Sequence, residues 1–290
     1  NPNVVINGGF DVWQRNTSFT SLSYYQDYAD RWMGDAYNNT GNTISRQSGT
    51  ASEPFYYFLR FQRDASNTGT GMRRVGTVFE SRNTRFMCGQ EVTLSFYARK
   101  GANWSPTDSF TSVIFTGTGN DESMNLGQGS AWTGYAQQTQ SNTLTTSWQR
   151  FTHTVTLSAT AQQVGLQFLA QAASGTAGAD DYFDLGGVKL ELGGVATPFM
   201  NKGFGQELAA CQRYYQKAST TTPYTGPCTN GVTFGGEIYF ANYFRGTPTV
   251  TTAHVTSSSF PGTTPTAGDI QKGKFYCTKA ADGTGSVGYF

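Results

Sequence analysis

Two stretches of this sequence alternate apolar and polar residues with a period of two, and this pattern constrains the fold more than any other feature. The apolar positions of the first stretch are Val92, Leu94, Phe96 and Ala98. Those of the second are Phe151, His153, Val155 and Leu157, and Val164, Leu166 and Phe168 repeat the pattern further on. Because successive side chains of a strand point to opposite faces, each stretch predicts a half-buried strand of an antiparallel sheet.

Other segments add strands to this sheet structure. Residues 55–61 have high β propensity and little alternation, which predicts a strand covered on both faces. Residues 75–80, 110–115 and 182–192 predict further strands, whereas the polar, glycine-rich residues 117–144 predict a long loop. Five or more strands separated by turn signals predict an all-β chain built as a β-sandwich.

Composition supports this fold class and excludes several functions. Aromatic residues make up 14% of the 290 residues and charged residues only 13%, so burial of rings can drive folding. The net charge of +1 gives no basic surface for nucleic acid. No run of about 18 apolar residues is present, so no membrane insertion is expected. The chain begins Asn-Pro rather than Met, as expected for a processed product or a piece of a longer polypeptide.

The opening stretch, residues 7–32, concentrates tryptophan and charge. It contains Trp13 and Trp32, and Arg15, Asp30 and Arg31 could pair along the rim of their apolar surface. Asn-Gly and Gly-Gly at its start are turn signals. We interpret it as a terminal strand docked into the sandwich, a tryptophan-anchored core with structural ion pairs, rather than as a ligand site.

This stretch also carries a family resemblance. The run NGGFDVWQR followed by YADRW resembles the start of a β-sandwich module of bacteriophage and prophage tail fibres and minor tail proteins, which is similar to jelly-roll carbohydrate-binding modules. The resemblance continues at VTLSFYAR, SWQRFT and GVKLELG and closes with ATPF and ELAACQRYY, so it covers residues 1 to about 217. It implies a jelly-roll-like sandwich in a phage tail.

Domain organisation follows from a helix and a composition change. Residues 204–217 place Phe204, Leu208, Cys211 and Tyr215 on one helical face. After Ser219 the chain turns rich in Thr, Pro and Gly, with short strands predicted at residues 236–244, 247–255, 273–279 and 285–290. We therefore predict a sandwich over 1–200, a junction helix over 201–218 and a small β domain over 219–290. The helix packs either on its own domain or against symmetry mates.

Catalytic patterns are absent from the sequence. His153 is interpreted as a hydrogen-bonded core histidine, and no nucleophile or phosphate-binding motif occurs. Glycoside hydrolysis needs two carboxylates at a fixed separation. The adjacent pairs Asp121-Glu122 and Asp180-Asp181 are not ready-made dyads, because neighbours in a strand point to opposite faces. We predict no catalytic residues, with a polysaccharide depolymerase as a third alternative.

Sugar binding requires aromatic faces flanked by polar groups. The polar loops that hold Trp104, Trp132 and Tyr135 fit this requirement best, with Asn103, Asp108, Asn120, Gln128 and Gln137 around them. Alternatively, these aromatic rings cap the ends of the sandwich. The second domain is a rival location for the site, and its candidate aromatics are Tyr224, Phe234, Tyr239, Tyr243 and Phe260.

The resemblance implies further features. It implies a non-catalytic receptor-binding tail component in the virion that binds a host surface polysaccharide, contacts other tail proteins and forms a homo-oligomer, most simply a trimer. The alternative is a structural tail module without a ligand. A structural calcium is implied as possible, with Asp11 and Asp184 as ligands if the first and last strands meet.

The four cysteines show no metal-binding spacing and are expected to be free thiols.

Overall fold

The computed structural model describes residues 3–22, 25–36, 41–106, 110–123, 132–170, 174–217, 233–252 and 266–280. The chain divides into two compact units, Asn1–Glu207 and Leu208–Phe290, and each is described by itself. The boundary lies inside the segment 201–218 that the sequence predicts as a junction. The predicted limits of the two domains, 1–200 and 219–290, stay predictions.

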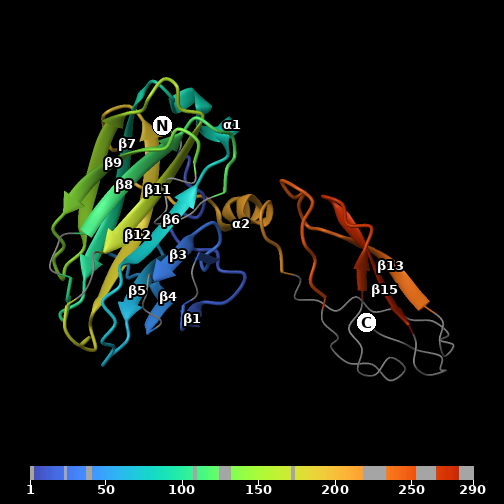
Figure 1. Cartoon of the computed structure of the whole chain (residues 1–290), viewed down its shortest axis with the longest axis horizontal. Helices are drawn as coiled ribbons and strands as arrows, with labels where there is room; N and C mark the ends of the chain where they lie inside the picture. Colours follow the sequence, from blue (N-terminus) through green and yellow to red (C-terminus); the bar gives the residue numbers. More distant parts are fainter. Residues whose placement is uncertain are drawn as a thin grey trace. The chain divides into compact units, whose positions relative to one another are not determined.

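The first unit contains two antiparallel sheets of six strands each within its described residues (Figure 1). The first sheet, sheet A, has the order β1, β4, β5, β12, β7, β10. Its strands are β1 (Ser18–Thr20), β4 (Asn42–Ser48), β5 (Tyr57–Arg63), β12 (Tyr182–Leu192), β7 (Glu91–Lys100) and β10 (Gln149–Thr156).

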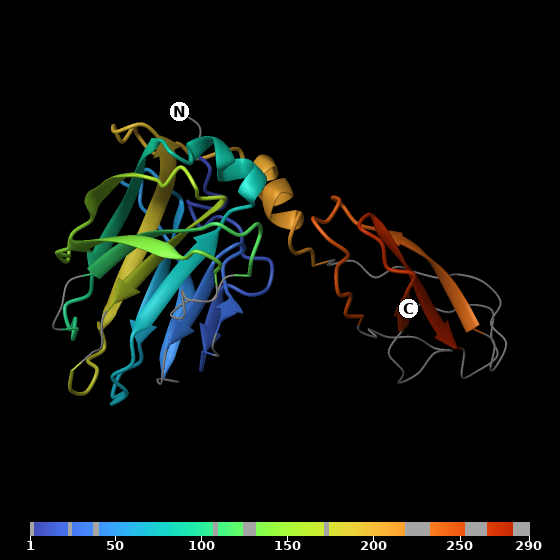
Figure 2. The ribbon, with the colours of Figure 1, turned by 45° about the horizontal axis from the view of Figure 1, so that its top comes forward.

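The second sheet, sheet B, has the order β2, β3, β6, β11, β8, β9. Its strands are β2 (Gln26–Asp27), β3 (Met33–Ala36), β6 (Arg73–Val78), β11 (Gln163–Ala170), β8 (Phe110–Gly117) and β9 (Ala136–Asn142). Figure 2 shows the strands of this unit as layers, with the short helices α1 (Ser81–Thr84) and η1 (Arg85–Met87) at one end. The all-β sandwich predicted from the sequence is confirmed.

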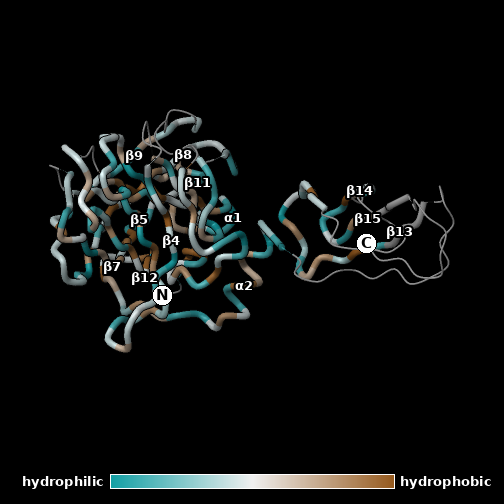
Figure 3. Tube along the Cα trace, turned by 90° about the horizontal axis from the view of Figure 1, so that it is seen from below, coloured by the Kyte–Doolittle hydropathy of each residue, from teal (hydrophilic) through white to brown (hydrophobic). Residues whose placement is uncertain are grey.

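The core between the sheets is built from the predicted alternating positions. Val92, Leu94, Phe96 and Ala98 of β7 are fully buried, as are Val164, Leu166 and Phe168 of β11. Figure 3 colours the chain by hydropathy and shows brown, hydrophobic segments among the labelled strands of this unit. The Phe96 ring lies 4.8 Å from the Phe168 ring in an edge-on contact, and such pairs add about 0.5–1.5 kcal/mol beyond their burial.

The opening stretch forms the predicted tryptophan-anchored core. Trp32 is fully buried, 4.9 Å from the Phe10 ring, and its Nε1 donates to the Asn7 carbonyl at 2.9 Å. Arg15 pairs with Asp27 at 3.3 Å and with Asp30 at 3.9 Å. The predicted terminal strand is wrong, because residues 3–14 are irregular. Residues 3–8 run beside β12 through bonds such as Val4 N to Leu190 O.

Two of the longer strands, β4 and β9, escaped the sequence interpretation, as did the short strands β1, β2, β3 and Thr266–Gly268. β4 lies in a segment that looked merely polar, and β9 lies inside the predicted loop 117–144, so that loop is partly wrong. β9 is a sheet-edge strand with mostly exposed glutamine, threonine and serine side chains, so neither of its faces leaves an apolar signature. By contrast, β5 is covered on both faces as predicted: Leu59 and Phe61 enter the core, whereas Phe58 packs on the outer face.

The predicted helix is shorter than expected: α2 spans Phe204–Gln212. Its predicted apolar face holds only in part, because Cys211 is fully buried whereas Phe204 is 60% exposed. The second unit contains an antiparallel sheet ordered β13 (Thr233–Tyr239), β15 (Lys274–Ala280), β14 (Thr266–Gly268). β13 and β15 correspond to two predicted strands. Residues 247–252 are irregular, and residues 253–255 and 285–290 lie outside the described residues.

The expectations about membrane spans, cysteines and metal sites can be compared only with the residues that the structure describes. There, no helix is long and apolar enough to cross a membrane. Cys88, Cys211 and Cys277 are free thiols, whereas Cys228 lies outside the described residues. No group of three or more His, Cys, Asp or Glu side chains is placed to hold a metal ion within the same ranges.

Candidate functional site

The outer face of sheet A carries a row of three charged residues, which we name the arginine row: Arg60, Asp184 and Arg99. They lie directly opposite one another on β5, β12 and β7. Arg60 donates to both carboxylate oxygens of Asp184, Nε to Oδ1 at 2.8 Å and Nη2 to Oδ2 at 3.0 Å. Nε of Arg99 donates to Oδ2 at 2.7 Å. One carboxylate therefore holds two guanidinium groups in fixed positions.

Aromatic rings hold the same two guanidinium groups from the side. The Arg60 guanidinium lies 3.6 Å from the centre of the Tyr182 ring. That of Arg99 lies 4.7 Å from the Trp148 ring and 5.3 Å from the Phe58 ring. Cation–π contacts of this kind are worth about 0.5–2 kcal/mol and restrict the plane of the guanidinium. The rings of this row therefore orient its arginines.

A return of the chain covers the neighbouring part of this face. Phe199 packs with Phe55 and Phe58, and Arg150 donates to the Thr197 carbonyl. Glu191 accepts from the Thr197 backbone N–H at 2.9 Å and from its hydroxyl at 2.7 Å. The ATPF motif, residues 196–199, thus closes over one part of the outer face, and the arginine row lies beside that cover.

The arginine row reaches solvent through its arginines only. The side chains of Arg60 and Arg99 are 20% and 26% exposed, whereas Asp184 is fully buried. The Nη1 and Nη2 atoms of Arg99 have no acceptor among the described residues, since its one bond to Asp184 uses Nε. The row thus offers oriented hydrogen-bond donors to a ligand oxygen. The sequence interpretation missed it, although Arg99 lies at an outward position of the alternating β7.

Trp132 and Tyr135, two predicted sugar contacts, lie together on a different sheet. They cluster with Val78, Val113 and Phe115 on the outer face of sheet B. Trp132 is only 5% exposed, and its Nε1 donates to the Ser123 carbonyl at 2.9 Å. Tyr135 is half-buried, and its hydroxyl donates to Gln137 Oε1 at 2.6 Å. Their role in sugar binding stays a prediction.

Trp104, the third predicted contact, packs against the main core rather than with Trp132. Its ring lies edge-on to Phe183 at 6.4 Å, and the Arg73 guanidinium lies 5.2 Å from its centre. Of the polar residues predicted around these aromatics, Asn103, Asn120 and Gln137 are exposed. Asp108 and Gln128 lie outside the described residues.

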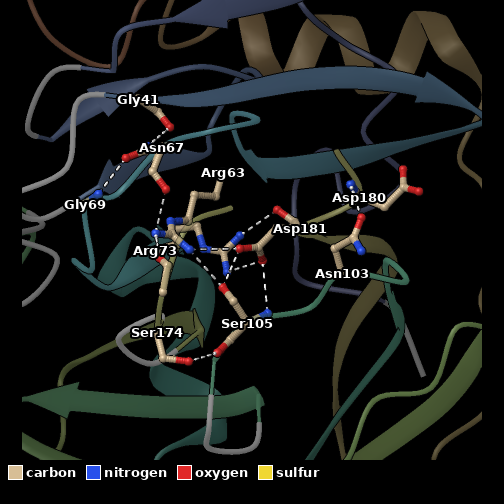
Figure 4. Close-up of polar contacts among 11 residues, drawn as sticks. Gly41, Arg63, Asn67, Gly69, Arg73, Asn103, Ser105, Ser174, Asp180 and Asp181 are labelled. Carbon is tan, nitrogen blue, oxygen red and sulfur yellow. Dashed lines mark hydrogen bonds and ion pairs between the residues drawn. The ribbon is translucent and has the colours of Figure 1, made fainter. Parts of the chain in front are cut away.

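Beside Trp104 lies a buried charge cluster formed by Arg63, Arg73 and Asp181, none of which is exposed (Figure 4). Arg63 Nη1 donates to Asp181 Oδ2 at 3.3 Å, and Arg73 Nη2 donates to Oδ1 at 3.2 Å. Ser105 donates to the same carboxylate through its backbone N–H and its hydroxyl. Two cations thus share one anion, and burial lowers the pKa of Arg73 to about 10.

The adjacent carboxylate pairs behave as the sequence predicted. Asp180 is exposed whereas Asp181 is buried in the charge cluster, so the two do not face one space. Asp121 accepts from the Ser81 backbone N–H, whereas Glu122 accepts from Thr133 and Gln163. His153 is buried, 3.4 Å from the Ser112 hydroxyl, and burial lowers its pKa. This is the predicted core histidine.

The two predicted calcium ligands have different surroundings. Asp184 does not fit a calcium ligand, because both of its oxygens accept bonds from guanidinium groups that would repel a cation. Asp11 lies near Glu207, and burial together with that second carboxylate raises the pKa of Asp11 to about 6. Calcium binding at Asp11 stays a prediction.

The raised pKa of Asp11 predicts a pH-dependent stability. The unfolded chain releases this proton near pH 3.8 and the folded unit near 6, so Asp11 makes the unit less stable as pH rises through this interval. We expect Asp11→Asn to raise the free energy of unfolding at about pH 7.5 and to leave it nearly unchanged at about pH 4. Urea unfolding in EDTA at the two pH values measures this. An equal effect at both would contradict the assignment.

No protein-family model and no curated protein matches this chain. Among solved structures, the tailspike protein 4 enzymatically active domain of bacteriophage CBA120 aligns with a TM-score of 0.42 and 10% identity, over 66% of this chain and 21% of that one. TmCBM61 in complex with β-1,4-galactotriose aligns at 0.36 and 10%, over 67% and 100%.

The CBM22-1 xylan-binding domain of Xyn10C from Paenibacillus barcinonensis aligns with a TM-score of 0.35 and 12% identity, over 62% of this chain and 98% of that domain. This chain spans about a fifth of the tailspike chain and nearly the full length of the two binding domains. These TM-scores are low, and the fold of this chain is defined by its own sheets and core.

Proposed function

We propose that this chain is a non-catalytic, glycan-binding component of a bacteriophage tail fibre or spike, and that it attaches the virion to a host surface polysaccharide. The observation that carries the proposal is the arginine row. Partly exposed arginine side chains lie on the outer face of a sheet, and Asp184, Tyr182 and Trp148 orient their guanidinium donors. Sugar hydroxyls and ring oxygens are acceptors for such donors. The tail-fibre resemblance of residues 1–217 supports the setting.

The assembly completes the proposal. A homotrimer, held in the tail by other tail proteins, would present three copies of the site to a repeating polymer. A weak single-site affinity then grows by orders of magnitude through effective concentration. Calcium at Asp11 belongs to the same proposal as a structural ion, and neither nucleic acid nor membrane insertion is part of it.

A retention assay tests the proposal. The full chain is incubated with immobilised bacterial surface polysaccharides, and retention and polymer length are recorded together. We expect retention without shortening, weakened about tenfold or more by Arg99→Met, because a charged hydrogen bond contributes about 1.5–3 kcal/mol. The exposed Arg82 on α1 supplies the control: Arg82→Met should bind as the unchanged chain does.

The alternatives give different results in the same assay. Burial of Trp132 favours a structural tail module, because that alternative expects the loop aromatics to be buried. A structural module is retained by no polysaccharide, the host's own included. Shortened chains would identify a depolymerase and contradict the non-catalytic proposal.

A further inference from the structure

The arginine row also indicates what kind of sugar it would bind, an inference that depends on the proposed function. We propose that the site recognises an acidic saccharide, one whose ring carries a carboxylate such as that of a uronic acid. The groups of the row that can reach a ligand decide which ligand fits. The single carboxylate of the row, Asp184, is fully buried and already accepts three hydrogen bonds. Within the row, only the guanidinium donors therefore reach the solvent.

The geometry of these donors suits a planar anion. Both Nη atoms of Arg99 have no acceptor among the described residues, and this nitrogen pair is the fork that binds a carboxylate with two parallel bonds. The Trp148 and Phe58 rings, which lie nearly perpendicular to each other, contact the Arg99 guanidinium and restrict its movement before a ligand arrives. A sugar hydroxyl would use one of the two donors, whereas a carboxylate uses both.

Positive and negative charges both lie at the row, so some substitutions should weaken the binding of an anionic ligand and others should strengthen it. Two positive charges share the negative charge of Asp184, which leaves one positive charge in excess within the row. Two further carboxylates act on the row from its margin: Glu53 interacts with Arg99, and Asp180 interacts with Arg60. Both would repel an anionic ligand, so removing either charge should strengthen binding.

The experiment uses matched ligands. Acidic bacterial capsular polysaccharides are immobilised, each beside the same polymer after its carboxyl groups have been reduced to alcohols, and dextran sulfate is included as a sulfate-bearing polymer. We expect the full chain to be retained on one or more intact polymers and to bind their reduced forms about tenfold more weakly or worse. Equal retention on both forms, or retention on dextran sulfate alone, would overturn the acidic-sugar assignment and leave glycan binding standing. No retention on any polymer would overturn both proposals.

Variants separate the fork from its charge. Arg99→Lys keeps the positive charge but removes the paired donors, so it should lose most of the preference for the intact polymer, and Arg99→Met should do the same. Glu53→Gln and Asp180→Asn should each increase retention on the intact polymer and leave the reduced polymer unaffected. The urea midpoint of each variant shows that the fold is kept. If Arg99→Lys retains the full preference, the fork is not the recognition element.

Discussion

Replacing Asp181 by asparagine is expected to destabilise the first unit by about 3–5 kcal/mol, because it leaves two buried guanidinium groups without their counter-charge. Arg63, Arg73 and Asp181 are all fully buried, and both arginines pair with this carboxylate within 3.3 Å. The Nε atoms of both arginines already lack an acceptor in this structure. The cluster therefore has no second anion, among the described residues that contact it, to replace the lost charge.

The neighbouring residue supplies the control for this prediction. Asp180→Asn removes the same charge from an exposed position and should change the stability by less than about 0.5 kcal/mol. Urea unfolding followed by tryptophan fluorescence is the measurement. All five tryptophans belong to the first unit, so the signal reports on that unit alone. Equal losses from the two substitutions would show that the buried cluster is not a stabilising element.

The second large effect is expected at Asn7, where alanine should cost about 3–5 kcal/mol. The Asn7 side chain donates to the carbonyls of Val12 and Asp30 at 2.8 and 2.9 Å, and it accepts from the Val12 N–H at 2.9 Å. Each buried group left unpaired costs about 1–3 kcal/mol. Asn7 also has φ of 57°, a left-handed conformation that asparagine tolerates better than alanine does.

Two further variants divide this cost. Asn7→Gly keeps the left-handed backbone accessible and loses only the side-chain bonds, so it should be about 1 kcal/mol more stable than Asn7→Ala. Asn16→Ala removes an exposed asparagine of the same stretch, whose side chain accepts from Thr17 N, and should cost less than about 0.5 kcal/mol. A loss at Asn7 no larger than that at Asn16 would contradict the anchoring role.

The sequence predicted those parts of the fold in which one face of a strand is buried. The inward residues of β7 and β10 could be named in advance from the period of two. The burial of β10 follows that period, whereas Thr93 and Ser95 of β7 are buried as well, so the prediction of a half-buried strand holds only in part for β7. β9 could not be found in this way, because an edge strand with solvent on both sides has no apolar period. The irregular start of the chain was mistaken for a strand because its apolar residues pack through turns, with left-handed backbone at Asn7 and Phe10.

The candidate site was harder to predict than the fold. Sequence alternation places Arg99 and Asp184 on outward positions, but their pairing depends on the register between β5, β12 and β7. That register shifts by an irregularity between Gly186 and Lys189, which no local pattern reveals. The exposure of the loop aromatics could not be predicted from the sequence either. Trp132 is buried because its ring packs against Phe115, a residue of another segment that only the folded chain brings close to it.

The central claim, that a glycan binds at the arginine row, can be tested most directly with the tryptophan side chains as reporters. The chain is labelled with 5-fluorotryptophan, each ¹⁹F resonance is assigned by a tryptophan-to-phenylalanine variant, and oligosaccharides cut from a retained polysaccharide are titrated in. The Trp148 ring contacts the Arg99 guanidinium, and its Nε1 has no hydrogen-bond acceptor among the described residues. Trp132 packs on sheet B instead, and its Nε1 donates a hydrogen bond to the Ser123 carbonyl. We predict a saturable shift of the Trp148 resonance with that of Trp132 unchanged. A shift of the Trp132 resonance with the Trp148 resonance unchanged would place the ligand on sheet B and contradict binding at the arginine row.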